Sequence, residues 1–164
     1  MLNFLLRRIP DETSQPNILL IDDDRDIRTV TNLVLMTSGI GTIHEAASGQ
    51  EGLEMARQIR PDVILLDIKL PDIGGETVLQ LLKMDPWTRE IPVVLFSAQT
   101  KNHENLQAWP VADVVSKPFY PQHLCESVCR ALGKPYSIEA EGERGGSWSM
   151  RSGRPVPTAI PAAT

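Results

Sequence analysis

Residues 62–76 read DVILLDIKLPDIGGE, and this stretch gives the clearest indication of the fold. Val63 to Leu66 are apolar on both alternating faces, which is typical of a parallel strand buried between two layers of helices. Asp67 ends this run and is followed by a loop that contains Pro71 and the pair Gly74-Gly75. Open α/β sheets carry their reacting groups at the carboxyl ends of such strands. A helix cap or a loop carboxylate is the simpler interpretation of Asp67, so the rest of the chain has to decide between them.

Strand and helix patterns alternate on both sides of this stretch. Apolar runs predict further strands at 17–21, 42–46, 91–96 and 111–115. Helical spacing predicts helices at 24–39, 48–61, 75–86 and 121–133, with a short, weakly periodic helix at 99–109. A βα unit repeated five times predicts an α/β fold, a doubly wound five-stranded parallel sheet with helices on both faces.

The first two helices have recognisable ends. Asp23 or Asp24 is a candidate N-cap for the first helix, and Gly39 supplies its C-terminal stop. One face of that helix carries Ile27, Val34 and either Val30 or Thr31. The second helix begins with Ser48 and Glu51 in a capping-box pattern. These ends support the alternation on which the fold prediction depends.

Composition and charge exclude several classes of protein. The chain has 164 residues, 41% hydrophobic and 23% charged, which is ordinary globular usage. The formal net charge of -5 provides no basic surface for nucleic acid. No run approaches the ~18 apolar residues of a membrane span, and the opening MLNFLLRRIP has its apolar residues before its arginines, the reverse of a secretory signal. We expect a cytoplasmic protein with no direct nucleic-acid or membrane partner.

The sequence divides into an ordered domain and two flanking segments. The domain is predicted to span residues 16–134, after a flexible N-terminal arm at 1–15. Residues 135–164 are dominated by Gly, Ser, Arg, Pro and spaced Glu, a composition that predicts a disordered tail. Cys125 and Cys129 share one face of the last predicted helix and are expected to be small buried side chains, because their spacing is not that of a metal or redox pair.

Polar side chains stand at or near the ends of the predicted strands. These residues are Asp22 and Asp23, Asp67, Ser97, and Lys117. Because the carboxyl ends of parallel strands all point the same way, these groups can meet in one crevice. Taken singly, Ser97 could be a turn hydroxyl and Lys117 a solvated charge. The coincidence of all of them favours a site.

Three carboxylates in one crevice require a cation, since two ionised groups ~4 Å apart repel by roughly 4 kcal/mol at an effective dielectric of 20. Oxygen-only ligands favour a hard divalent ion, and Mg²⁺ suits a few carboxylates together with phosphate oxygens. With the charge of Lys117 such a site is close to neutral and can accept a phosphoryl group. An oxygen of Asp67 would attack in line, and Ser97 would then hydrogen-bond to the transferred group.

These residues and their order resemble the receiver domain of two-component response regulators. The resemblance covers about 17–133 and rests on four motifs, ILLIDDDRDIR, PDVILLDIKLPDIGG, VVLFSAQ and VVSKPF. It implies the flavodoxin-like fold with strand order 2-1-3-4-5. It also implies that a sensor histidine kinase or phosphotransfer protein phosphorylates Asp67. Mg²⁺ would be held directly by Asp23 and Asp67, mainly through water by Asp22, and by the backbone carbonyl of Lys69.

The sequence departs from the family pattern in one segment. The family often has Tyr or Phe three residues before the lysine, rotating inward when Ser or Thr bonds the phosphoryl group, whereas this chain has Val114. Trp109-Pro110 also stands where the family commonly has Gly-Ala. Both changes fall on the face through which many receivers dimerise or bind targets. They leave the geometry of the output open.

Two other functions are alternatives to the one that this resemblance implies. A haloacid-dehalogenase-like phosphatase would use Asp22 as its nucleophile, but it needs an acidic pair after the lysine and no aspartate follows Asp113. A pseudo-receiver would fold and bind partners without being phosphorylated. We predict instead a stand-alone phosphoacceptor that is not an enzyme beyond assisting its own phosphorylation and dephosphorylation. It would switch contacts with an output protein that the sequence does not identify, or form a phosphorylation-dependent homodimer.

Overall fold

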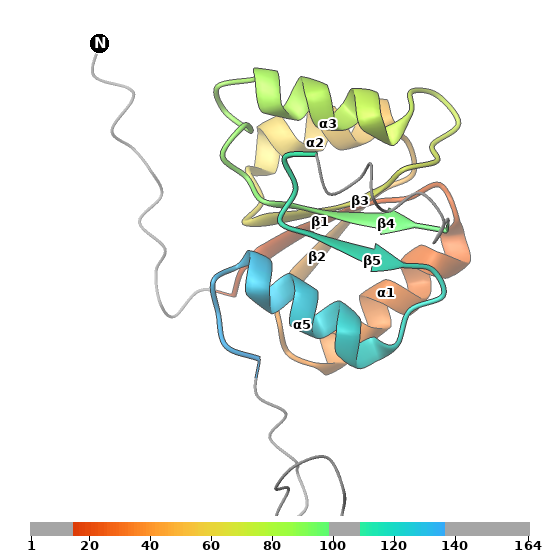
Figure 1. Cartoon of the computed structure of the whole chain (residues 1–164), viewed down its shortest axis with the longest axis vertical. Coiled ribbons are helices and arrows are strands. Elements are labelled where there is room, and N and C mark those ends of the chain that lie inside the picture. Colours follow the sequence, from red (N-terminus) through yellow and green to blue (C-terminus); the bar gives the residue numbers. More distant parts are fainter. Residues whose placement is uncertain (1–14, 99–108, 137–164) are drawn as a thin grey trace, which may run out of the picture.

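A computed structural model describes residues 15–98 and 109–136 of the chain (Figure 1). Nearly all of the predicted N-terminal arm and C-terminal tail, and most of the weak helix predicted at 99–109, lie outside these described residues. None of the helices within the described ranges is long and apolar enough to cross a membrane.

The centre of the molecule is a five-stranded sheet in which every pairing is parallel. The strand order is β2-β1-β3-β4-β5, as predicted. The five strands are β1 (Asn17–Ile21), β2 (Thr42–Ala46), β3 (Val63–Asp67), β4 (Val93–Ser97) and β5 (Asp113–Ser116). All residues of β3 and β4 are buried, which explains why their sequences are continuous apolar runs.

Helices cover both faces of the sheet, as the alternating pattern predicted. In Figure 1, α2 and α3 lie together over one face, whereas α1 and α5 lie over the other. Their bounds are α1 (Arg25–Thr37), α2 (Gly49–Ile59), α3 (Gly75–Met84) and α5 (Pro121–Ala131). Each face has its own hydrophobic core, and alternate residues of β1 and β3 contribute to each of the two cores.

Two strands start later than their apolar runs suggested. β4 begins at Val93 because the Ile91 N–H is bonded to the Thr88 carbonyl in a turn and Pro92 has no N–H to donate. β5 begins at Asp113, since the Val111 N–H is bonded to the Trp109 carbonyl. Local hydrogen bonds therefore shorten both strands at their amino ends.

The start of α1 settles two alternatives that the sequence left open. Asp24 is the N-cap, and its carboxylate accepts hydrogen bonds from the backbone N–H groups of Asp26 and Ile27. Thr31 faces the core and is fully buried, whereas Val30 is half exposed. Capping by Asp24 leaves the side chain of Asp23 free of this local structural role.

Candidate functional site

Three aspartates from two neighbouring strands meet at the carboxyl edge of the sheet. Asp67 ends β3, and Asp22 and Asp23 directly follow β1, which pairs with β3 at Ile21 and Leu66. One carboxylate oxygen from each of the three aspartates lies within 4.8 Å of those of the other two. Asp22 is fully buried, Asp67 is 6% exposed and Asp23 is exposed. The sheet thus concentrates negative charge at one point, partly out of water.

Lys117 supplies positive charge to this cluster from beyond the end of β5. Its Nζ lies 2.5 Å from Oδ2 of Asp22 and 3.3 Å from Oδ2 of Asp67. The Lys117 side chain is only 12% exposed, so it is not a solvated surface charge. Its backbone N–H donates to the Ser97 carbonyl at 2.7 Å, which fixes the start of the side chain beside β4. One lysine therefore contacts acids from both β1 and β3.

The environments of Asp22 and Asp67 differ. Asp22 uses both of its oxygens within the chain, because Oδ1 accepts the backbone N–H of Asp24 at 2.9 Å and Oδ2 accepts Lys117. For Asp67, burial raises the pKa and the charge of Asp22 adds to this effect, while Lys117 and a backbone N–H from Lys69 oppose it. The fold thus destabilises the ionised form of Asp67 in spite of its contact with Lys117.

Ser97 and Lys69 lie beside this cluster. Ser97 ends β4 and is 3% exposed, one position after Phe96, which pairs with Asp67 in the sheet. Lys69 follows Asp67 by two positions and donates its backbone N–H to the Asp67 carboxylate. The predicted role of the Lys69 carbonyl as a metal ligand, like the predicted role of the Ser97 hydroxyl, stays a prediction.

The donor set of the cluster fits a hard divalent cation. Asp22, Asp23 and Asp67 offer carboxylate oxygens alone, and such ligands suit Mg²⁺ or Ca²⁺ better than soft metals. Because Asp22 is fully buried and lies closer to Lys117 than Asp67 does, at 2.5 Å against 3.3 Å, Asp23 and Asp67 are the acids more accessible to a cation. A small number of protein ligands, with water completing the shell, is the usual arrangement for Mg²⁺.

The loop after Asp67 is anchored to α2 by a carboxylate that the sequence analysis did not single out. Asp72 accepts the backbone N–H groups of Gly49 at 2.9 Å and Gln50 at 2.8 Å. These hydrogen bonds lower the pKa of Asp72 to about 2. Gly75 closes the loop, since its N–H donates to the Ile68 carbonyl and a Cβ there would lie 2.3 Å from the carbonyl oxygen of Asp67. Only distant sequence partners produce this anchor, so no local pattern could have predicted it.

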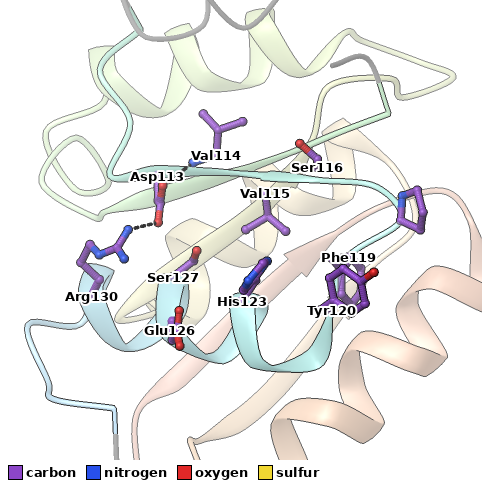
Figure 2. Close-up of a pocket in the computed structure, with 11 residues that line it drawn as sticks. Asp113, Val114, Val115, Ser116, Phe119, Tyr120, His123, Glu126, Ser127 and Arg130 are labelled. Carbon is purple, nitrogen blue, oxygen red and sulfur yellow. Dashed lines mark hydrogen bonds and ion pairs between the residues drawn. The ribbon is translucent and has the colours of Figure 1, made fainter. Parts of the chain in front are cut away.

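A hollow of about 420 Å³ lies between β5 and α5, and it is distinct from the acidic cluster (Figure 2). Asp113 and Arg130 form an ion pair of 2.6 Å at one end of it. Val114 points to the opposite side of β5 from Val115, toward the core beneath α2 and α3. The position where the family often has an aromatic residue is therefore occupied by a partly buried aliphatic side chain.

The fold and the site together define a class of protein. A parallel sheet of order β2-β1-β3-β4-β5, with acids and a lysine at its carboxyl edge, is a flavodoxin-like α/β architecture with its polar site at the switch point. A family model for the response regulator receiver domain matches residues 18–129. The chain belongs to this family, whose members are signalling domains of two-component systems.

Individual relatives agree with this assignment. The DNA-binding dual master transcriptional regulator RpaA of Synechocystis sp. is 35% identical over 119 residues, covering 71% of this chain and 48% of RpaA. The chain therefore spans about half the length of that relative. The structure of chemotaxis protein CheY4 of Vibrio cholerae superposes with a TM-score of 0.67 at 26% identity. The match covers 73% of this chain and 100% of CheY4.

A third similar structure is relevant to the acidic cluster. The receiver domain of a sensor histidine kinase from Pseudomonas aeruginosa matches with a TM-score of 0.67 and 25% identity, over 74% of this chain and 100% of that domain. That structure has a magnesium ion coordinated in its active site cleft. Receiver domains thus include members that hold Mg²⁺ in the cleft, and this chain has a cluster of oxygen ligands at the carboxyl edge of its sheet.

Proposed function

We propose that this chain is a phosphorelay receiver that accepts a phosphoryl group on Asp67 in a Mg²⁺-dependent reaction. The donor would be a sensor histidine kinase or a phosphotransfer protein. The observation that carries the proposal is the meeting of Asp22, Asp23 and Asp67 within 4.8 Å, with Lys117 contacting two of them. The acids outnumber the single lysine, so the cluster favours a divalent cation and, with that cation, a phosphoryl group.

The residues of the chain divide the chemistry among them. A carboxylate oxygen of Asp67 attacks phosphorus while the bond from phosphorus to the donor nitrogen breaks, and that nitrogen keeps the electron pair. Lys117 neutralises charge on the acceptor, because its Nζ is 3.3 Å from Oδ2 of Asp67. Ser97 would donate its hydroxyl hydrogen to a phosphoryl oxygen after transfer. Bound Mg²⁺, held by Asp23, Asp67 and the Lys69 carbonyl, with Asp22 acting through water, would neutralise phosphoryl oxygens.

The rival nucleophile is disfavoured by its contacts. A haloacid-dehalogenase-like phosphatase would use Asp22, but both oxygens of Asp22 are engaged by Lys117 and the Asp24 N–H, and the side chain is fully buried. Asp67 is 9% exposed at its side chain and lies at the end of the central strand. The greater exposure of Asp67 and its longer distance to Lys117 support Asp67, rather than Asp22, as the acceptor.

Phosphorylation would act by changing protein contacts. The phosphoryl group adds about -1.5 to -2 charges at a partly buried edge of the sheet, and such a change biases any element with two arrangements. We propose that the phosphorylated chain acts in the cytoplasm through an output protein or a phosphorylation-dependent homodimer. The route from Asp67 to that surface would bypass an aromatic relay, because Val114 occupies the usual aromatic position.

The experiment is to incubate the full chain with labelled acetyl phosphate, with and without Mg²⁺, and to locate the label by peptide mapping. We expect a single label on Asp67 that requires Mg²⁺ and is lost in Asp67→Asn. Asp24→Asn is the matched control, since Asp24 is an exposed helix cap outside the cluster. Label that persists in Asp67→Asn and disappears in Asp22→Asn would refute the assignment. A chain that binds no Mg²⁺ and takes no label would be a pseudo-receiver.

A further inference from the structure

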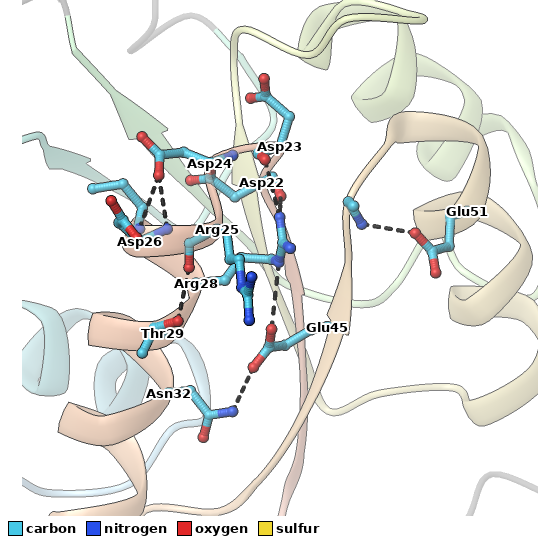
Figure 3. A network of polar contacts seen from close by, with 12 residues as sticks. Asp22, Asp23, Asp24, Arg25, Asp26, Arg28, Thr29, Asn32, Glu45 and Glu51 are labelled. Carbon is cyan, nitrogen blue, oxygen red and sulfur yellow. Dashed lines mark hydrogen bonds and ion pairs between the residues drawn. The ribbon is translucent and has the colours of Figure 1, made fainter.

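Arg28 of α1 holds the loop that carries two of the three clustered acids (Figure 3). Its Nη1 donates to the backbone carbonyl of Asp22 at 2.8 Å and to that of Asp23 at 3.1 Å. The Arg28 side chain is only 15% exposed, and its hydrogen bond to the Asp22 carbonyl is partly buried, whereas that to the Asp23 carbonyl is exposed. A guanidinium can span two adjacent carbonyls because its donors lie in one rigid plane.

Two further residues hold the guanidinium in place. Nε of Arg28 lies 3.3 Å from Oε2 of Glu45, which is on the edge strand β2. The other oxygen of Glu45 accepts Nδ2 of Asn32, one turn further along α1, at 2.5 Å. Figure 3 shows the three side chains as one network from α1 and β2 to the backbone of the acidic loop. The network touches no side chain of the acidic cluster, only its backbone.

We propose that Arg28 is a positioning residue for the metal end of the site, and that Glu45 and Asn32 act through it. This inference rests on the proposed function. By binding consecutive carbonyls, Arg28 fixes the peptide groups on either side of Asp23 and hence the direction of its side chain. Asp22 is held independently by Lys117 and by the Asp24 N–H. Asp23 is exposed, so the direction of its side chain depends on the backbone that Arg28 holds.

An electrostatic role and a positioning role of Arg28 predict opposite changes in Mg²⁺ affinity when Arg28 is removed. The proposal is therefore testable. If Arg28 acted only as a nearby positive charge, its loss would strengthen Mg²⁺ binding, because cation and arginine repel. If it positions the loop, its loss weakens binding, since freeing the loop lets Asp23 adopt orientations that miss the ion. Residues that orient metal ligands typically change affinity by about 10–100-fold when mutated.

The experiment is Mg²⁺ titration of the full chain by calorimetry, comparing Arg28→Gln with Arg25→Gln. Arg25 is a matched control because it is also at the start of α1, carries the same charge and is exposed. We expect about tenfold weaker Mg²⁺ binding for Arg28→Gln, and binding by Arg25→Gln equal to or tighter than that of the wild type. Binding by Arg28→Gln as tight as that of Arg25→Gln would overturn the inference.

A double-mutant cycle tests the second layer of the network. Glu45→Gln should weaken Mg²⁺ binding by a smaller factor, about twofold to fivefold, because the Arg28 carbonyl contacts survive in part. In the Arg28→Gln background the same change should have no effect, whereas a purely electrostatic role of Glu45 would persist there. Arg28→Lys should recover part of the affinity. A persistent Glu45 effect would overturn the proposed route through Arg28.

Phosphorylation kinetics separate positioning from a general loss of structure. With acetyl phosphate as donor, Arg28→Gln should raise the Mg²⁺ concentration for half-maximal labelling and leave the rate at saturating Mg²⁺ near that of the wild type. A lowered maximal rate with an unchanged half-maximal concentration would contradict the inference. If Arg28→Gln does not fold by circular dichroism, Arg28→Lys and Glu45→Gln carry the same test. Wild-type protein that binds no Mg²⁺ would instead refute the proposed function, and this inference with it.

Discussion

Asp67 and Asp72 belong to the same stretch of sequence, yet the fold shifts their pKa values in opposite directions. Burial raises the pKa of Asp67 in spite of the neighbouring Lys117. The N–H groups of Gly49 and Gln50 lower the pKa of Asp72 to about 2. Asp72 is thus an anchor whose charge the chain itself satisfies. The chain does not fully stabilise the ionised form of Asp67, so an external cation can do so.

The same contrast separates the two edges of the sheet. At the amino edge, Asp62 accepts the Asn17 N–H at 2.7 Å, and Lys83 donates to the Arg89 and Ile91 carbonyls at 3.0 and 2.9 Å. At the carboxyl edge, two of the three clustered carboxylates, those of Asp22 and Asp67, share the ammonium of Lys117. The charged groups at the amino edge are thus held by backbone groups of the chain, whereas the carboxyl edge keeps an excess of negative charge that a cation and a phosphoryl group can use.

The largest expected effect comes from removing Lys117, the cation that contacts the carboxylates of Asp22 and Asp67. Lys117→Met leaves the buried Asp22 without its partner, and we expect metal-free protein to lose about 3 kcal/mol of unfolding free energy. Urea denaturation in the presence of a chelator measures this loss. Arg130→Met is the control, since it removes a cation from the more exposed pair with Asp113, where an effect below about 1 kcal/mol is expected. Equal losses in the two variants would contradict the contrast between the edges.

An intermediate effect is expected where the loop closes behind Asp67. A Cβ at Gly75 would lie 2.3 Å from the Asp67 carbonyl oxygen, so Gly75→Ala must shift the backbone and should cost about 1–3 kcal/mol. Because that shift moves Asp67, Mg²⁺ affinity should fall as well. Gly74→Ala is the control, because a Cβ there has nothing within 4 Å. Urea denaturation and calorimetry give both quantities, and equal behaviour of the two variants would exclude this role for Gly75.

The smallest effects are expected from the pH dependence of the two aspartates, and their signs are opposite. The raised pKa of Asp67 makes its ionised form costly in the folded state, so metal-free Asp67→Asn should be more stable than the wild type. This gain should grow as pH rises above the unfolded value of about 3.9 and level off above the folded pKa. The contribution of Asp72 is fully present above the unfolded value of about 3.9 and is lost as pH falls toward about 2.

Asp72→Asn should therefore be less stable than the wild type at neutral pH, and the difference should vanish near pH 2. Solvent screening at this exposed site keeps the effect modest. Urea midpoints of the two variants, measured against pH with a chelator present, test both signs. Shifts of the same sign in both variants would show that the contrast between Asp67 and Asp72 is wrong.

Local sequence patterns predicted most of the fold, because each helix or strand meets its burial and capping requirements with nearby residues. Three features depend only on neighbouring residues. They are the apolar runs of β1 and β3, the capping box at Ser48, and the positive φ of Gly39 at the end of α1. The errors in the predicted strand starts also have local causes. β4 and β5 begin later than predicted, because turn hydrogen bonds at Ile91 and Val111 compete with sheet pairing.

The sequence by itself determined which residues could form the site, since acids, hydroxyl and lysine at the ends of parallel strands must share one edge. Only the tertiary structure decided how they divide the work. Asp24 caps α1, Asp22 is bound by a lysine 95 positions away, and Arg28 reaches the acidic loop with Glu45 behind it. Such contacts depend on distances between segments far apart in the chain, and no local pattern encodes those distances.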